Sequence, residues 1–442
     1  MVNNHKILFR RLRSFLFIFF DIFFFKIIFY FANNTFQNIL YENIIIFNWI
    51  IISYLIGRYY LKYKSKKDIY IKSISYTFLL LILCNLSLSL LSFIFEKIFL
   101  INSSELFITL DALLIIILYT FVSNIFITIY NSENKKNFGN WIVLGNKDSI
   151  FKSENLFLNL DYKSNFFHLA DIDDYKNKYG SLSGIIISDN LKFNTDNNKI
   201  FLKLQKLNLP IFNYQNWCRD YLFRYPPEIF ANKNILLFDI HKLRNSIDSR
   251  SKRFFDFFVS FLLLIFLSPV ILIACTLIKL ENNGPVFYSQ IRTGYLGKQF
   301  RLWKIRTMKV NAEPEGPVWS SKNDKRTLRI GKILRFSRID ELPQLISVIK
   351  GEMSLIGPRP ERPEIEVDLI KKIPNYMYRY QAKPGLSGWA QVNYPYGASI
   401  TDSKNKLSYD LFYIMNYSIF LDIIIFINTL RIVINRNNSK PL

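Results

Sequence analysis

The chain has 442 residues, of which 50% are hydrophobic and 17% aromatic, and its formal net charge is +23. The length suggests two or three domains, and a soluble protein of this size rarely carries so many apolar and aromatic residues, so membrane segments are expected. Nucleic-acid binding is disfavoured because no zinc-finger spacing, basic helix or RNA-binding aromatic motif is present. Three cysteines (Cys84, Cys218 and Cys275), two of them in apolar runs, imply neither a disulfide framework nor a cysteine metal site.

Four long apolar runs come first, at about 15–32, 44–61, 74–95 and 107–130. Each is close to the roughly 20 residues that a helix needs to cross a bilayer. The first run is rich in Phe and has no small-residue cleavage site after it, which argues against a signal peptide. The sequence therefore predicts four transmembrane helices within residues 1–133.

Positive charge alternates between the loops that join these runs. Lys and Arg gather in segments 6–13, 62–72 and 135–136, whereas 33–43 has none and 96–106 has only Lys97. Because basic loops stay inside, this predicts an inner-membrane protein whose N-terminus and residues from 131 onward face the cytoplasm. The net charge then has two explanations, attraction to anionic lipid or phosphorylated substrates, or a Lys-, Asn- and Ile-rich composition without functional meaning.

Residues 138–245 have the pattern of a small α/β domain. Short apolar runs at 141–145, 184–188 and 235–238 predict buried strands separated by polar stretches. A dinucleotide-binding loop would need G-x-G-x-x-G after the first strand, and only Gly145 stands there. We therefore predict a cytoplasmic Rossmann-like domain without a cofactor.

The same domain contains Asp171-Ile-Asp173-Asp174. A D-x-D element can hold a metal-bound nucleotide sugar in some glycosyltransferases. A solvated acidic loop has the same composition, and we favour that interpretation.

A fifth apolar run, from Phe254 to about residue 280, is interrupted by Ser268-Pro269. Proline removes a backbone donor and kinks a helix, and a serine can satisfy the freed carbonyls inside lipid. Basic residues flank both ends, Lys252 and Arg253 before the run and Lys279 after it. This pattern favours a re-entrant membrane helix that returns to the cytoplasmic face over a full crossing.

A series of short motifs fills residues 251–442. In order they are Lys252-Arg253-x-x-Asp256, Gly284–Gln290, Arg292-x-Gly294, Phe300–Met308, Gly331–Gln344, Lys350–Pro363 and Lys383–Gln391. This series resembles the bacterial sugar transferase family, the polyprenyl-phosphate glycosylphosphotransferases. The four preceding runs and the Rossmann-like domain are also similar to the large subclass of that family. Pro358-Arg-Pro-Glu-Arg-Pro363 resembles its hexose-transferring members, and the resemblance implies a mostly helical catalytic module.

The C-terminal module restricts the nucleophile. It contains no His, and its only Cys, Cys275, lies in the apolar run, so Ser-His and Cys-His chemistry are excluded there. A carboxylate nucleophile remains open. Asp340 and Glu341 are adjacent and would diverge by roughly 100° on a helix, whose first turn Pro343 would suit. The resemblance makes Asp340 the nucleophile and Glu341 the ligand of Mg²⁺; an exposed acidic pair at a helix start is the alternative.

The resemblance also assigns residues to substrate. Arg335 is expected to grip phosphate, as guanidinium does bidentately. Arg359 is expected to bind phosphate or the lipid carrier from a loop that its neighbouring prolines stiffen. The assigned substrate- or phosphate-binding set is Arg335, Arg359, Pro358, Pro360, Gln391, Lys252 and Arg253. The alternatives are a surface arginine at 335, a rigid turn at 358–360 and a structural loop at 385–391.

The expected reaction moves a hexose-1-phosphate from a UDP-sugar to undecaprenyl phosphate, releases UMP and initiates exopolysaccharide or O-antigen synthesis. Two alternatives stay open, a D-x-D glycosyltransferase and a non-catalytic membrane scaffold. The resemblance also implies a homodimer formed through the N-terminal half. The last apolar segment, 411–434, contains Asp422 and Asn428, so an interfacial helix is favoured over a crossing one.

Overall fold

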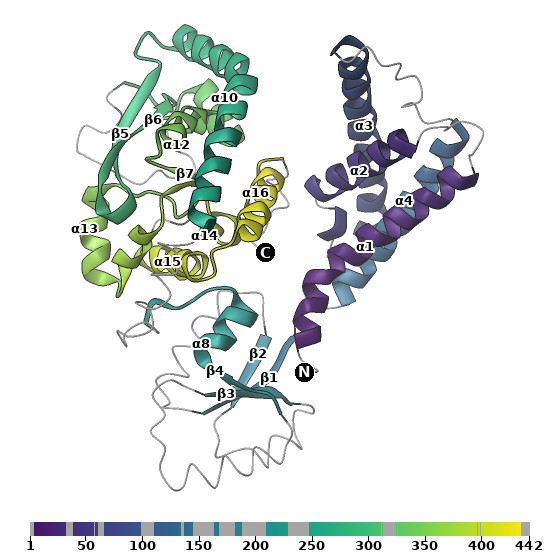
Figure 1. Cartoon of the computed structure of the whole chain (residues 1–442), viewed down its shortest axis with the longest axis horizontal. Coiled ribbons are helices and arrows are strands. Elements are labelled where there is room, and N and C mark those ends of the chain that lie inside the picture. Colours follow the sequence, from purple (N-terminus) through teal and green to yellow (C-terminus); the bar gives the residue numbers. More distant parts are fainter. Residues whose placement is uncertain are drawn as a thin grey trace, which may run out of the picture. The chain divides into compact units, whose positions relative to one another are not determined.

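The computed structural model describes residues 4–31, 39–56, 58–60, 66–98, 110–133, 137–144, 163–167, 182–187, 209–228, 247–310, 312, 324, 326–395, 397 and 399–434. The described residues are mostly helical and form two compact units, Met1–Trp217 and Cys218–Leu442 (Figure 1). The predicted strand at 235–238 and the D-x-D element at 171–173 lie outside the described residues.

Four long helices open the first unit and cover the four predicted apolar runs. They are α1 (Asn4–Phe31), α2 (Ile39–Leu55), α3 (Lys66–Ile98) and α4 (Leu110–Glu133). Their facing sides bury an apolar cluster that includes Phe25, Trp49 and Leu80. Their outer sides expose large side chains such as Phe78 and Leu118, 62% and 67% accessible, which is the pattern of a surface that meets lipid rather than water.

Two helices of the described residues are long and apolar enough to cross a membrane. One is Ser73–Ser92 within α3, and the other is Arg250–Glu281 in the second unit. Shorter apolar helices occupy Glu42–Leu55 and Leu114–Ile129. This composition is consistent with a membrane protein, and the number of crossings stays a prediction.

A buried polar network connects α1, α3 and α4 through the short turn that follows α2. Arg58, in the short 3₁₀ turn η1 (Arg58–Tyr60), forms an ion pair with Asp21 of α1. Its Nε donates to Asn124 Oδ1 of α4 at 2.7 Å, and the Asn124 amide donates to Thr77 of α3 at 3.1 Å. The hydroxyl groups of Tyr59 and Tyr119 also donate to the Asp21 carboxylate. Because an unpaired charge is costly in an apolar surrounding, this network fixes how the helices pack.

A four-stranded parallel sheet follows, in the order β2-β1-β3-β4. Its strands are β1 (Asn137–Leu144), β2 (Lys163–Phe167), β3 (Leu182–Ile187) and β4 (Ile211–Asn213). The strands predicted at 141–145 and 184–188 are confirmed as β1 and β3. Trp141 is buried against Phe212 and against Trp217 of the short helix α8 (Tyr214–Trp217). A parallel sheet agrees with an α/β domain, while its Rossmann-like nature stays a prediction.

The second unit is dominated by the 35-residue helix α10 (Ile247–Glu281). The helix continues past the predicted break at Ser268-Pro269. The Ser268 hydroxyl donates to the Ile265 carbonyl at 2.7 Å, the carbonyl to which Pro269 has no N–H to donate. Figure 1 shows that the helix bends partway along instead of running straight. Most of its long apolar side chains are exposed, including Phe266 at 74% and Leu272 at 68%.

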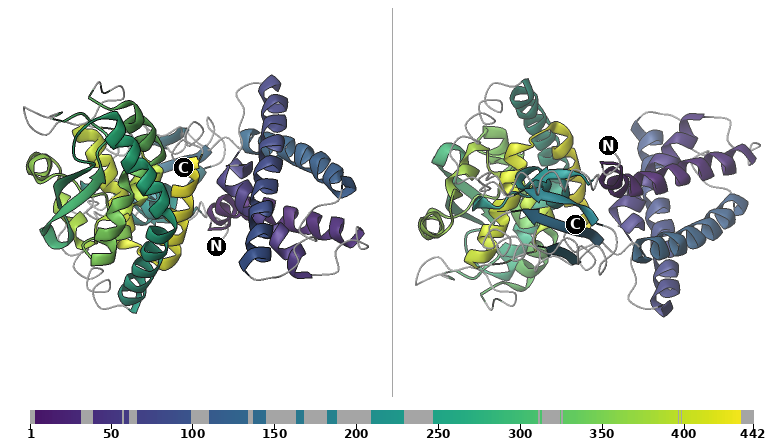
Figure 2. Two further views of the ribbon diagram at one scale, coloured as in Figure 1. Left: turned by 90° about the horizontal axis from the view of Figure 1, so that it is seen from above. Right: turned by 90° about the horizontal axis from the view of Figure 1, so that it is seen from below.

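The remaining elements complete the mostly helical second unit. They are β5 (Phe287–Thr293), η6 (Tyr295–Gly297), β6 (Gln299–Ile305), α11 (Arg329–Ser337), η7 (Ile339–Gln344), α12 (Leu345–Lys350), β7 (Ser354–Ile356), α13 (Pro363–Lys372), η8 (Tyr376–Gln381), β8 (Gly385–Ser387), α14 (Trp389–Asn393), α15 (Ile400–Met415) and α16 (Ile419–Ile434). Of these, α11, η7, α12 and β7 pack on α10. β5 and β6 pair as an antiparallel hairpin, and β7 and β8 pair in parallel. Both views of Figure 2 show the yellow α16 close to the teal α10.

A segment that precedes α10 in the chain also belongs to this unit. Residues 218–228 begin with the π-helical turn η4 (Cys218–Leu222) and lie along α14 and α15. The Phe223 carbonyl accepts from the Trp389 indole at 2.9 Å, and the Tyr225 amide donates to the Ser408 carbonyl at 2.8 Å. These contacts join residues 218–228 to the second unit.

Candidate active site

The acidic pair lies in the 3₁₀ turn η7, between two short helices. Helix α11 ends at Arg338, whose left-handed φ of 61° turns the chain, and α12 begins directly after Gln344. A 3₁₀ helix has three residues per turn, so neighbouring side chains diverge by about 120°. Pro343 lies inside η7 and not in the first turn of an α-helix, which corrects the expectation from sequence.

Three cations surround the Glu341 carboxylate. Arg359 approaches it with both terminal nitrogens, Nη2 at 2.6 Å from Oε1 and Nη1 at 3.4 Å from Oε2. Lys304 Nζ donates to Oε1 at 2.8 Å, and Arg338 Nη1 lies 3.6 Å from Oε2. The Glu341 side chain is only 8% exposed, so these charges act in a partly desolvated setting.

Asp340 has a different environment. It is buried, with 6% of its surface exposed, and its Oδ1 has no hydrogen-bond partner among the described residues. A buried polar atom without a partner is costly, so functional sites are where such atoms are retained. Asp340 therefore presents an oxygen that is free to react or to bind a ligand.

The two carboxyl groups differ in their affinity for protons. Burial, together with the neighbouring Glu341 charge, raises the pKa of Asp340 to about 6. Burial would also raise the pKa of Glu341, but Arg359, Lys304 and Arg338 outweigh it and hold that pKa well below its usual range. Glu341 is thus a fixed anion, whereas Asp340 is the more basic of the two.

Lys304 was not among the residues predicted from sequence. It lies on β6 opposite Tyr288 of β5. Along this strand Phe300, Leu302 and Lys304 alternate with more exposed residues and share the inward face. A lysine that continues an inward apolar face is the signal that could have identified it. Burial, partly opposed by the Glu341 charge, lowers the pKa of Lys304.

Arg335 acts on the acidic pair through its charge. It stands in the last turn of α11, where its Nε donates to Thr307 Oγ1 at 2.8 Å and its Nη1 to Thr327 Oγ1 at 3.4 Å. Its charge helps to lower the pKa of Asp340 against the effect of burial. The structure thus brings the predicted Arg335, Arg359 and the acidic pair into one region.

Arg359 reaches Glu341 from the loop between β7 and α13. Pro358 and Pro360 restrict the backbone on both sides of it, and a residue that precedes proline is itself confined to extended conformations. The Gly385 amide donates to the Pro358 carbonyl at 2.9 Å, which joins this loop to β8. The predicted stiff loop is therefore present, and its arginine side chain points at the acidic pair.

Lys252 and Arg253, also predicted to bind phosphate, are engaged elsewhere. Arg253 donates to the Val348 and Ile349 carbonyls at the C-terminal end of α12, both at 2.5 Å. Lys252 Nζ forms an ion pair with Asp422 of α16 at 2.6 Å. Their contacts show both side chains holding α10 against the rest of the unit.

The loop with Gly385, Gly388 and Gln391 packs mainly against protein. A side chain at Gly385 would clash with the Gly357 backbone. The two backbone segments can lie this close because both positions are glycine. Trp389 is buried and stacks on Phe412 with ring centroids 5.7 Å apart. Gln391 donates to the Leu386 carbonyl at 3.3 Å, while its buried Oε1 has no partner among the described residues. These contacts favour the structural interpretation of this loop.

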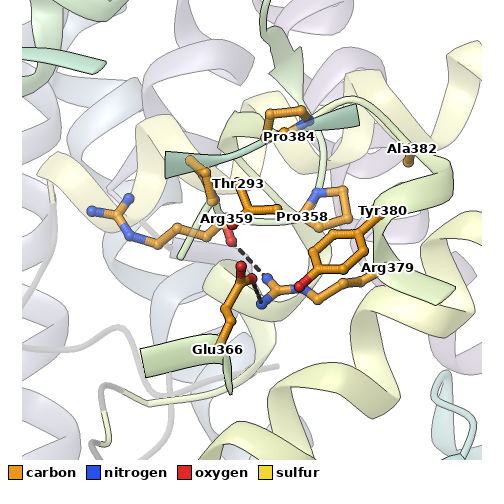
Figure 3. A pocket seen from close by; sticks show the side chains of 10 residues that line it. Thr293, Pro358, Arg359, Glu366, Arg379, Tyr380, Ala382 and Pro384 are labelled. Atoms are coloured by element: carbon orange, nitrogen blue, oxygen red, sulfur yellow. Dashed lines mark hydrogen bonds and ion pairs between the residues drawn. The ribbon is translucent and has the colours of Figure 1, made fainter. Parts of the chain in front are cut away.

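A small pocket adjoins the proline loop, residues 358–361. It is lined by Thr293, Gly294, Pro358, Arg359, Pro360, Glu366, Arg379, Tyr380, Ala382 and Pro384. Figure 3 shows the Arg359 side chain leaving this pocket in the direction opposite to Arg379. The pocket therefore adjoins the backbone of the loop, and the guanidinium of Arg359 serves the acidic pair on the other side.

The carboxylates fit Mg²⁺. Mg²⁺ commonly takes one or two protein carboxylates and completes its shell with water and substrate phosphates. The partnerless Asp340 Oδ1 and the Glu341 oxygens supply such hard oxygen ligands. No cluster of three or more His, Cys, Asp or Glu side chains occurs in the described part of the chain, so the remaining ligands would have to come from substrate and water.

An acidic pair surrounded by cations, in a unit with a long apolar helix, has the chemistry expected of a protein that handles phosphate groups at a membrane. Comparisons with known proteins agree with this class. Residues 247–436 match the family model described as bacterial sugar transferase. The UDP-N-acetylgalactosamine-undecaprenyl-phosphate N-acetylgalactosaminephosphotransferase of Aeromonas hydrophila is 43% identical over 183 residues, 41% of this chain and 43% of that protein.

Two UDP-glucose:undecaprenyl-phosphate glucose-1-phosphate transferases are also similar. The protein of Klebsiella pneumoniae is 39% identical over 196 residues, 44% of this chain and 42% of its own. The protein of Caulobacter vibrioides is 37% identical over 198 residues, 44% of this chain and 74% of its own. The chain thus spans about two fifths of the first two relatives and most of the third. It belongs to the bacterial sugar transferase family.

Proposed function

We propose that this protein transfers a hexose-1-phosphate from a UDP-sugar to undecaprenyl phosphate and releases UMP. The observation that carries the proposal is the acidic pair itself, a buried Asp340 with a partnerless oxygen beside a Glu341 held by three cations. The relatives named above share a UDP-sugar donor and an undecaprenyl-phosphate acceptor in their names and differ in the sugar. The sugar is therefore left as a hexose.

The chemistry follows from the two carboxylates. An Asp340 oxygen attacks the β-phosphorus of the donor, the bond from that phosphorus to the bridging oxygen breaks, and UMP leaves with that oxygen. A phosphate oxygen of undecaprenyl phosphate then attacks the same phosphorus and releases the Asp340 carboxylate. Arg359, Lys304 and Arg338 offer the positive charge that two anionic reactants need if they are to approach each other.

We further propose that Glu341, with Asp340 beside it, holds Mg²⁺ when the donor binds. Mg²⁺ would supply neutralisation of the diphosphate charge. The protein's own part is to keep Glu341 ionised, which its three cationic neighbours do. The D-x-D alternative at Asp171 and Asp173 lies outside the described residues and gains no support from the site.

The membrane arrangement proposed is a re-entrant α10 on the cytoplasmic face. Both ends of the helix contact the same module, since Arg253 binds the end of α12 and the Glu281 carboxylate accepts from the Arg329 and Ile330 amides at the start of α11. A helix that crossed the bilayer would leave these partners on opposite sides. The exposed apolar middle, the proline inside the helix and the bend of α10 in Figure 1 support a helix that enters lipid and returns.

The proposal is tested with membranes that contain the full chain. They are supplied with undecaprenyl phosphate, Mg²⁺ and a panel of UDP-sugars, and both the nucleotide and the lipid product are identified. Wild type should release UMP, and Asp340→Asn should abolish both products. Asp368→Asn, an exposed carboxylate on α13, is the matched control and should keep activity. UDP as the product, or normal UMP release by Asp340→Asn, would refute the mechanism.

A further inference from the structure

Four consecutive carbonyls of the proline loop, residues 358–361, are each held by a different donor. The Pro358 carbonyl accepts from the Gly385 amide at 2.9 Å, and the Glu361 carbonyl accepts from the Thr293 amide at 3.1 Å. Between them, the Arg359 carbonyl accepts from Arg379 Nη2 at 2.6 Å and the Pro360 carbonyl from Arg292 Nη1 at 3.3 Å. The two prolines have no N–H group that could donate a hydrogen bond. The loop is therefore held mainly through hydrogen bonds that its carbonyls accept.

The hydrogen bond from Arg379 is the shortest of these four, and the Arg379 side chain is itself held in place. The side chain is 8% exposed, and it lies 3.2 Å from Asp410 of α15 and 3.7 Å from Glu366 of α13. Its Nη1 also donates to the Tyr376 hydroxyl at 2.5 Å. A buried arginine with two carboxylate partners is a fixed point in the structure, because moving it would leave those charges unpaired.

We propose that Arg379 is a positioning residue, which holds the backbone of Arg359 so that the Arg359 guanidinium stays on Glu341. Figure 3 shows the arrangement, with Arg379 on one side of the loop and the Arg359 side chain extending from the other. The chain of contacts runs from Asp410 and Glu366 through Arg379 to the Arg359 carbonyl, and from the Arg359 side chain to Glu341 at 2.6 Å.

The restricted backbone of Arg359 makes the hydrogen bond from Arg379 effective in positioning it. Arg359 precedes Pro360 and follows Pro358, so its own φ and ψ have little freedom. Once its carbonyl is fixed, the direction in which its side chain leaves the loop is fixed too. Arg379 contacts neither member of the acidic pair in the structure, so its effect on the reaction has to pass through Arg359. The functional part of this inference rests on the proposed transfer reaction.

The first experiment does not depend on turnover. Hydrogen exchange is measured by mass spectrometry in the full-length wild type, Arg379→Lys and Arg306→Lys. Arg379→Lys keeps the charge beside the two carboxylates but loses the planar fork. The loop is read through the peptides that contain Thr293 and Gly385, because these amides donate to the Glu361 and Pro358 carbonyls. Exchange in these loop peptides should be at least about tenfold faster in Arg379→Lys, the factor that corresponds to the loss of a hydrogen bond of about 1.4 kcal/mol. Unchanged exchange there would overturn the proposal.

Arg306→Lys is the matched control. Arg306 is another buried arginine, and it bonds Asn282 at 2.9 and 3.0 Å without contacting the proline loop. Its replacement should loosen the region of Asn282 and leave the loop peptides unchanged. Equal loosening of the loop in both variants would show general destabilisation and would also overturn the proposal.

The second experiment is a double-mutant cycle on kcat/KM with Arg359→Lys. Arg379→Lys should lower kcat/KM by about tenfold or more in the wild-type background, and by less than about threefold when Arg359 is already replaced. Arg306→Lys should cause the same fold loss in both backgrounds. Equal losses for Arg379→Lys in both backgrounds would overturn its action through Arg359. An inactive wild type would refute the proposed function instead, and the exchange experiment would still decide the positioning role.

Discussion

Replacement of Arg253 by Met tests whether the basic pair at the start of α10 tethers the fold or binds phosphate. Arg253 makes two charge-assisted hydrogen bonds to the last carbonyls of α12. Such bonds are each worth about 1.5–3 kcal/mol, and because one guanidinium makes both in a half-buried setting, we expect a joint loss of about 2–3 kcal/mol. Met keeps the apolar stem of the side chain and removes both donors.

The expected signal is a lower melting temperature. For a unit of this size each kcal/mol shifts the midpoint by about 2–4 °C, so Arg253→Met should melt roughly 4–12 °C below wild type. The assay is thermal unfolding of the full chain in detergent or nanodiscs, with and without UDP-sugar. Arg250→Met is the matched control, since Arg250 is an exposed arginine one turn earlier on the same helix, and it should shift the midpoint by less than about 2 °C.

The kinetic part separates the two interpretations. A tether that lies away from the acidic pair should leave the KM for undecaprenyl phosphate within about twofold of wild type at a temperature where the variant is folded. Unchanged melting combined with a clearly raised KM for the lipid phosphate would refute the tether and restore the phosphate-binding role that the sequence suggested.

Two further substitutions test the packing around the site. Trp389→Phe removes the donor to the Phe223 carbonyl and some buried volume, so the full chain should lose about 1–2 kcal/mol and become more sensitive to limited proteolysis near residues 218–228. The same change at Trp303, which is 41% exposed, should have little effect, and equal losses would contradict the docking of this segment. Gly385→Ala places a Cβ against the Gly357 backbone and should reduce folded yield and melting temperature sharply; a wild-type melting curve would contradict the close approach.

The sequence identified features whose signal is local. Apolar runs of the right length coincide with α1 to α4 and α10, and the short apolar segments at 141–145 and 184–188 are strands of the parallel sheet. The acidic pair and Arg359 were singled out because each lies in a short motif, and the structure brings them together; their roles stay predictions. Secondary structure and short motifs are patterns of residues that are close in sequence. Predicting them therefore needs no knowledge of distant contacts.

Side chains whose partners are distant in sequence were assigned less well. Arg253 was predicted to bind phosphate, yet its partners are carbonyls 95 and 96 residues away. Lys304 and Arg379 were not singled out, although one contacts Glu341 and the other the Arg359 carbonyl. A single sequence gives the chemistry that a lysine or arginine can do, while its partner is decided by the tertiary fold.

The structure also bears on which carboxylate attacks. Adjacent acidic residues are equivalent in a sequence, but here Arg359, Lys304 and Arg338 all contact Glu341, while Asp340 keeps an oxygen without a partner. Groups whose environments push their pKa values apart are suited to different tasks. A carboxylate beside three cations is a poor nucleophile because their charge lowers its basicity, and it is well suited to remain an anion. In the proposed reaction, the more basic Asp340, whose buried Oδ1 has no hydrogen-bond partner among the described residues, is the group from which attack on phosphorus would cost least.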